Sequence, residues 1–310
     1  MTRIRDQHIR GSIAFGAACD AALSVVLTSR ITGAGDRSLL LLSILAAAVA
    51  ALGLIAYGAA LNDLLDRRRD AVMSGSSVAA EHATGPNVII VVGALLLATF
   101  AAMTLGRDAT YVALVLATLL LFHNAVARFI PAIGLVVPGA VLAGIMLVPD
   151  WRMPMPAAVW LAMTIVVLAS VVVHVLADKR PVLSRRAVPV VVLGWAVVSV
   201  VTLGLRTGIG AQPWPEQSTF STLLWPLGAV LGLGLVLRWK VATAGSRRQA
   251  AAKIIRYVAL WQPIIAAAWC ASIGAWMPAV VFVVLGVVGL LVVGGYRELA
   301  GMSGPAARWR

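Results

Sequence analysis

The sequence predicts an all-α fold, a polytopic transmembrane helical bundle of nine to ten spans around a central cavity. Of its 310 residues, 61% are apolar and only 12% are charged, and the mean hydropathy is +0.96, which excludes an ordinary soluble domain. Apolar stretches of about 20 residues recur along the whole chain, each long enough to cross the hydrocarbon core of a membrane. The net charge of +13 is explained by basic loops at an anionic membrane surface, so nucleic acid is not an expected partner.

Charged residues, glycine and proline delimit the expected spans. The first apolar segment follows a basic N-terminus but lacks a small-residue cleavage site, so we interpret it as a retained span rather than a signal peptide. Pro131 breaks the helix after the fourth span. Because only a few residues separate the last two segments, the sequence leaves open whether they are separate spans. The expected ranges are about 11–28, 38–61, 87–105, 109–127, 131–148, 156–177, 187–205, 219–237, 257–273 and 276–295.

These spans are expected to form one membrane domain over 1–310, with a core at about 10–275 and an extra C-terminal span at about 276–295. The two cysteines lie inside apolar stretches and indicate neither a disulfide framework nor a zinc site. A cytoplasmic N-terminus would leave all but five of the 25 Lys and Arg residues on the cytoplasmic side. We therefore expect an integral, multi-pass membrane protein whose second, fourth and sixth spans end at the cytoplasmic face.

The stretch from Asn62 to Asp70, at the end of the second span, contains three acids on one side of a helix. Asp63, Asp66 and Asp70 fall within a sector of roughly 60°. Carboxylates this close repel one another unless a cation lies among them, and charges beside a membrane span are costly to keep. Oxygen ligands suit Mg²⁺, which commonly binds phosphate as well. We interpret the stretch as a metal–phosphate site; the alternative is a solvated helix end neutralised by the three arginines after Asp66.

Two further polar groups are expected at the same face. His174 and Asp178 have the i, i+4 spacing of one helix face. Arg128 stands at the end of the fourth span, near Asn124. Acids and bases around one cavity suit a diphosphate, although topology alone would also place basic residues here, and His174 could be an ordinary polar helix end. The expected basic residues are Arg128, Lys179, Arg180, Arg185 and Arg186.

These motifs resemble those of the UbiA superfamily of intramembrane prenyltransferases. Residues 62–70 match the family's NDxxDxxxD motif, which also stands at the end of the second span. The family's second motif, DxxxD at the end of the sixth span, reads here from His174 to Asp178. The stretch from Leu121 to Arg128 looks like the family segment that ends in a phosphate-binding Lys or Arg. The resemblance covers roughly residues 10–275.

The resemblance implies a Mg²⁺-dependent transferase that moves a prenyl group from an isoprenyl diphosphate to an acceptor within the membrane. The expected partners are this donor, an acceptor that the sequence does not identify, and membrane lipid. The implied metal-binding and catalytic residues are Asp63, Asp66, Asp70 and Asp178. The implied diphosphate-binding residues are Asn62, Asn124, Arg128, His174, Lys179 and Arg180.

The chain also departs from the family pattern. His174 stands where the second motif has its first acid, which would weaken a metal site built on Asp178 alone. The usual Arg-Pro pair after the first motif is missing, and the tenth span is extra. Two alternatives therefore stay open: a terpene cyclase of the same superfamily, and a non-enzymatic protein that binds or transports a lipid or isoprenoid.

Overall fold

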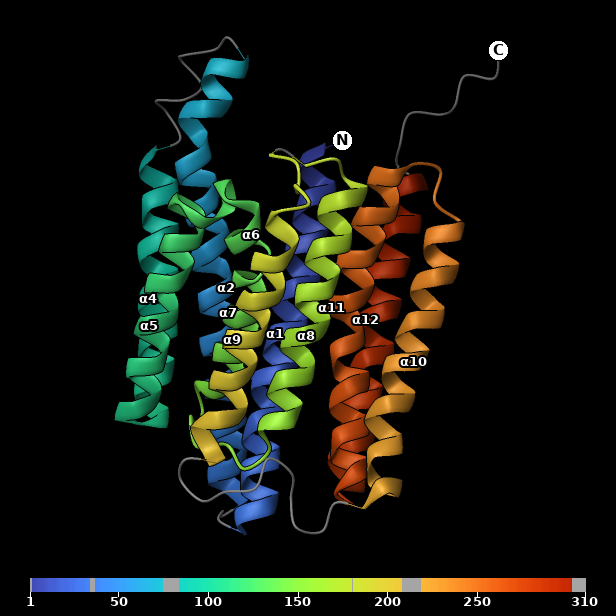
Figure 1. The fold of residues 1–310 in the computed structure, drawn as a ribbon. Helices are drawn as coiled ribbons and strands as arrows, with labels where there is room; N and C mark the ends of the chain where they lie inside the picture. The colour runs from blue at the N-terminus through green and yellow to red at the C-terminus, as the bar shows by residue number, and fades with distance from the viewer. Residues whose placement is uncertain (1, 34–36, 75–83, 180, 208–218, 303–310) are drawn as a thin grey trace.

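The computed structural model describes residues 2–33, 37–74, 84–179, 181–207 and 219–302, and these form a helical bundle (Figure 1). The helices are α1 (Thr2–Thr32), α2 (Arg37–Ser74), α4 (Thr84–Leu105), α5 (Arg107–Ala125), η1 (Ala127–Phe129), α6 (Pro131–Gly134), α7 (Val137–Leu147), α8 (Pro156–Leu176), α9 (Ala187–Thr207), α10 (Phe220–Ala242), α11 (Arg247–Ser272) and α12 (Trp276–Met302). The described residues contain no β-strand. The predicted all-α membrane fold is confirmed.

Eight of the described helices are long and apolar enough to cross a membrane. Two further apolar segments, Pro131–Leu147 and Trp276–Val292, are shorter. The last two predicted spans are separate helices, α11 and α12. Gly274 lies between them with φ 72°, a conformation that favours glycine, and its N–H donates to Ala271 O. The N–H of Ala275 donates to Cys270 O, which completes the hydrogen-bond pattern of a Schellman motif and ends α11.

Helices α1 and α11 form the centre of the bundle. They are the most buried of the membrane-spanning helices, and each contacts the other. Small residues allow this approach, because a Cβ added to Gly16 would lie 2.5 Å from the backbone oxygen of Ala259. On one side α1 packs against α2, which contacts α4 and α5; on the other side α11 packs against α8, α10 and α12.

The ends of α2, α5 and α8 lie at the same end of the bundle as the beginning of α1 (Figure 1). The end of α12 lies at this end of the bundle too (Figure 1). The predicted common end for the second, fourth and sixth spans is therefore confirmed. Its assignment to the cytoplasm rests on the distribution of basic residues and stays a prediction.

Candidate functional site

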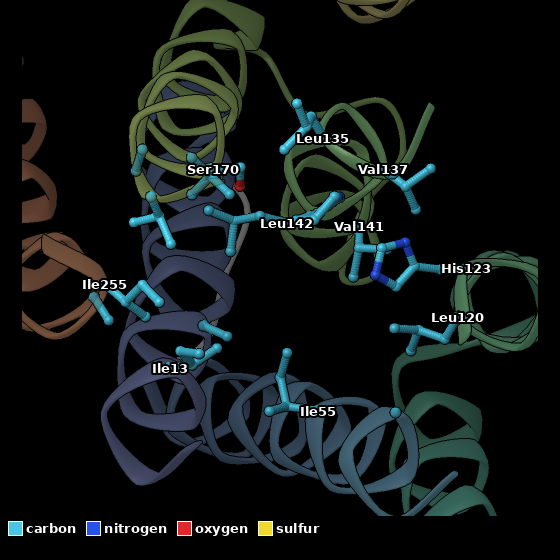
Figure 2. A pocket seen from close by; sticks show the side chains of 18 of the residues that line it. Ile13, Ile55, Leu120, His123, Leu135, Val137, Val141, Leu142, Ser170 and Ile255 are labelled. Carbon is cyan, nitrogen blue, oxygen red and sulfur yellow. The ribbon is translucent and has the colours of Figure 1, made fainter. Parts of the chain in front are cut away.

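A cavity of about 500 Å³ opens among α1, α2, α5 to α8 and α11. Its walls are mostly aliphatic, and Figure 2 shows Ile13, Ile55, Val141 and Leu142 facing the space between the helices. Such a volume and apolar lining are typical of a site for a small molecule. Polar side chains are concentrated at the end where α2, α5 and α8 finish, and we call this group the mouth. The mouth consists of Arg10, Asn62, His123, Asn124, Arg128, His174 and Lys179.

Arg128 joins the end of α5 to the acidic end of α2. Its Nη1 donates to Asn62 Oδ1 at 2.6 Å and to Asp66 Oδ2 at 2.9 Å, and its Nη2 donates to Asp66 Oδ1 at 2.6 Å. The local sequence explains this position. The α-helix stops at Ala125, the 3₁₀ turn η1 carries Arg128, and Pro131 starts the next helix, which places the guanidinium against α2. This bidentate ion pair between Arg128 and Asp66 fixes the orientation of the guanidinium.

Arg10 makes the equivalent contact from α1. Its Nη1 and Nη2 donate to the two carboxylate oxygens of Asp63, each at 2.5 Å. Both arginines line the cavity, whereas Asp63 and Asp66 are not among its lining residues. Each acid of the motif whose side chain the structure describes is thus paired with one arginine of the mouth. The sequence did not single out Arg10, although it lies on the α1 face that also carries Ile13 and Ala17.

Asn124 connects two walls of the cavity. It is buried, and its Nδ2 donates to Gly58 O of α2 at 3.1 Å and to Leu120 O of its own helix at 3.0 Å. Asn124 lines the cavity, and its amide ties α5 to α2. His123, one residue earlier, points into the cavity in Figure 2. Sequence reasoning missed His123, because a single histidine in an apolar helix gives no spacing signal.

The end of α8 differs from the expectation. We expected His174 and Asp178 on one helix face, but α8 ends at Leu176 and Asp178 has φ 48°, outside the helical range. His174 lines the cavity, with its Nε2 3.1 Å from Pro181 O, and Lys179 lines it too. Asp178 does not line it: its side chain is 71% exposed, and its Oδ1 lies 3.7 Å from Nη1 of Arg247. The termination of α8 therefore separates the two ends of the predicted motif.

Two of the predicted residues lie wholly or partly outside what the structure describes. The side chain of Asp70, on the last turns of α2, and all of Arg180 are in this group. Arg185 and Arg186 are described and exposed, and neither lines the cavity.

The end of α2 carries oxygen ligands of the kind that Mg²⁺ prefers, on Asn62, Asp63 and Asp66. Within the described residues, no group of three or more His, Cys, Asp or Glu side chains could hold a metal by itself. Mg²⁺ commonly needs only one or two protein carboxylates, because water and phosphate oxygens complete its shell. Asp63 and Asp66, next to Asn62 and one turn apart, meet this requirement. A second ion held by Asp178 does not fit this arrangement, because that carboxylate faces away from the cavity.

Comparison with known proteins supports the fold. No family model matches this chain, and no curated protein matches its sequence. A solved structure of digeranylgeranylglyceryl phosphate synthase, a membrane prenyltransferase, is similar over 89% of this chain and 100% of that chain. The TM-score is 0.52 and the sequences are 13% identical, so the likeness concerns the fold. This chain therefore shares its overall fold with that solved structure.

Proposed function

We propose that the protein is a Mg²⁺-dependent intramembrane prenyltransferase that transfers a prenyl group from an isoprenyl diphosphate to an acceptor. One observation carries the proposal: an apolar cavity of about 500 Å³ ends in a mouth where Arg10 and Arg128 pair with Asp63 and Asp66. The prenyl chain of the donor matches the aliphatic walls, and its diphosphate matches the arginines. The fold likeness to a prenyltransferase supports the same assignment.

In this proposal the mouth binds the diphosphate and stabilises it as it leaves. The guanidinium groups of Arg10 and Arg128 turn from the carboxylates toward phosphate oxygens, and Lys179 and His174 contribute from the end of α8. Asp63 and Asp66, with Asp70 on the next turn, would hold Mg²⁺, which supplies neutralising charge to the leaving group. We expect the mouth to face the cytoplasm, because most basic residues lie on that side.

The reaction breaks the bond between C1 of the prenyl chain and the diphosphate oxygen, and the diphosphate leaves with the electron pair. An electron pair of the acceptor forms the new bond to C1, and the acceptor loses a proton. Aliphatic residues such as Ile55, Val141 and Leu142 keep water away from the electron-deficient prenyl carbon. This exclusion favours transfer over hydrolysis.

The test uses the full-length protein in lipid nanodiscs, radiolabelled geranyl or farnesyl diphosphate, and a membrane lipid extract as the acceptor source. We expect Mg²⁺-dependent diphosphate release together with a labelled lipid product. Asp66→Ala should reduce both by at least about 100-fold, as the loss of a main charge-stabilising group commonly does. Asp108→Ala is the matched control, because Asp108 lies at the opposite end of α5 and accepts a hydrogen bond from Trp151. Unchanged turnover in Asp66→Ala would refute the proposal.

A second candidate is a protein that binds or transports an isoprenoid phosphate without transferring it. The position of Asp178 favours it, because this carboxylate lies beside Arg247 and not beside the arginines of the mouth. The same assay separates the candidates: tight binding of the labelled diphosphate with no release from any acceptor extract would support binding alone. A cyclised hydrocarbon formed without an acceptor would instead indicate a terpene cyclase.

A further inference from the structure

Deep in the cavity, α1 and α11 present matching faces. The lining residues of α1 are Ile13, Gly16, Ala17 and Asp20, and those of α11 are Ile255, Val258, Ala259 and Gln262. Each set has the i, i+3, i+4, i+7 spacing of one helix face. Both helices begin at the mouth end of the bundle and run in the same direction (Figure 1). Residues at equivalent places in the two sets therefore lie at similar depth.

Asp20 and Gln262 are the last residues of these two sets and lie farthest from the mouth. The helices touch one turn earlier, where Gly16 meets the backbone of Ala259. Ten residues separate Asp20 from Arg10, so the acid lies about 15 Å farther along α1. We call Asp20 and Gln262 the floor of the cavity. Between the mouth and the floor the walls are mostly aliphatic.

Three of the four polar side-chain atoms of the floor are buried without a partner within the described part of the chain. Asp20 is 1% exposed and Gln262 is 2% exposed. Asp20 Oδ2 and both Oε1 and Nε2 of Gln262 have no hydrogen-bond partner there. Buried polar atoms are normally hydrogen-bonded, and leaving them unsatisfied inside a membrane costs free energy. By contrast, the hydroxyl of Ser24, one turn beyond Asp20, donates to Met153 Sδ at 3.3 Å.

We propose that the floor is a binding site for the hydroxyl group of an otherwise apolar ligand, an alcohol or a phenol. A hydroxyl supplies one donor and two acceptor positions, which match the unpartnered acceptor of Asp20 (Oδ2) and the unpartnered donor of Gln262 (Nε2). An ether or a hydrocarbon of the same shape satisfies fewer of these atoms. The aliphatic walls accommodate the rest of the ligand. The proposal goes beyond prenyl transfer, because it requires only the cavity and its floor.

The test measures equilibrium binding of radiolabelled dodecanol and of dodecyl methyl ether to the full-length protein in nanodiscs, without diphosphate or metal. We expect the wild type to bind the alcohol about tenfold more tightly than the ether, the effect of one or two hydrogen bonds in a buried site. Asp20→Leu and Gln262→Leu should each reduce this preference to about twofold or less. Ser24→Ala, the matched control on the same helix, should retain it.

A stability measurement separates ligand binding from a structural role. Without ligand, Asp20→Leu should unfold at the same temperature as the wild type or higher, because it removes an unsatisfied polar group from an apolar site. A lower unfolding temperature for this variant would indicate that Asp20 supports the fold, and would overturn the proposal. Equal binding of alcohol and ether by the wild type would overturn it too. Because the assay contains no diphosphate, its outcome does not depend on whether the protein transfers prenyl groups.

Discussion

The mouth and the floor of the cavity differ in whether their polar side chains have partners within the protein. At the mouth, Asp63 and Asp66 each accept hydrogen bonds from both Nη atoms of one arginine. At the floor, Asp20 and Gln262 face the cavity without partners in the described structure. Paired charges keep the mouth assembled before a ligand arrives, and a ligand must exchange contacts there. The floor offers contacts that a ligand can gain without breaking others.

The largest expected effect is at the mouth. Arg128→Ala should reduce binding of an isoprenyl diphosphate by about 100-fold, because it removes a cation from the cavity and frees the carboxylate of Asp66 to repel phosphate. Arg128→Lys should recover part of this loss, since an ammonium supplies charge but cannot contact Asn62 and Asp66 in the same geometry. Binding measured by competition with a labelled diphosphate would check this. Equal affinity in Arg128→Ala and wild type would place the phosphate elsewhere.

A smaller effect is expected where α1 and α11 meet above the floor. Gly16→Ala should lower the free energy of unfolding by about 1–3 kcal/mol, because its Cβ would collide with the backbone of Ala259. Gly11→Ala is the control: it lies on the same helix with no other atom near its added Cβ, so it reports helix propensity alone. Steric trapping or detergent unfolding would measure both variants. Equal free energies of unfolding for Gly16→Ala and Gly11→Ala would mean that α1 and α11 move apart to accommodate the added Cβ without loss of stability.

The hydrogen bond of Asn124 to α2 tests how much a polar contact adds to the packing of α5 against α2. Asn124→Leu should cost about 1 kcal/mol of stability, because the amide that links α5 to Gly58 O of α2 is lost. Thr118→Val is a suitable comparison, since that exposed hydroxyl donates only to Leu114 O of its own helix. The same unfolding assay applies. A loss no larger than that of Thr118→Val would show that packing alone holds α5 against α2.

The smallest effect is expected at the end of α8. Asp178→Ala should change stability by less than about 0.5 kcal/mol, because its contact with Arg247 is long and both side chains are more than half exposed. Diphosphate release should likewise stay within about twofold of wild type. A loss of diphosphate release as large as that in Asp66→Ala would mean that Asp178 moves into the cavity when the substrate binds.

The sequence predicted the fold because membrane spans are read from local composition. Apolar segment lengths predicted the helical membrane fold, and the alternation of spans placed the ends of α2, α5 and α8 at one end of the bundle. Asn62, Asn124 and Arg128 stand near the ends of α2 and α5, and they line one cavity. These features depend on how far a helix must run to cross hydrocarbon, and each segment carries that information by itself.

Only the tertiary structure decided which charges pair and which face the cavity. No local pattern indicates that Arg10 contacts Asp63 across 53 positions, or that α8 ends two residues before Asp178 and turns its carboxylate outward. Nor could the sequence align Asp20 with Gln262, since their common depth depends on the parallel packing of α1 and α11 at Gly16. Hydropathy determines that a segment crosses the membrane, but close packing between helices determines the neighbours of each polar atom.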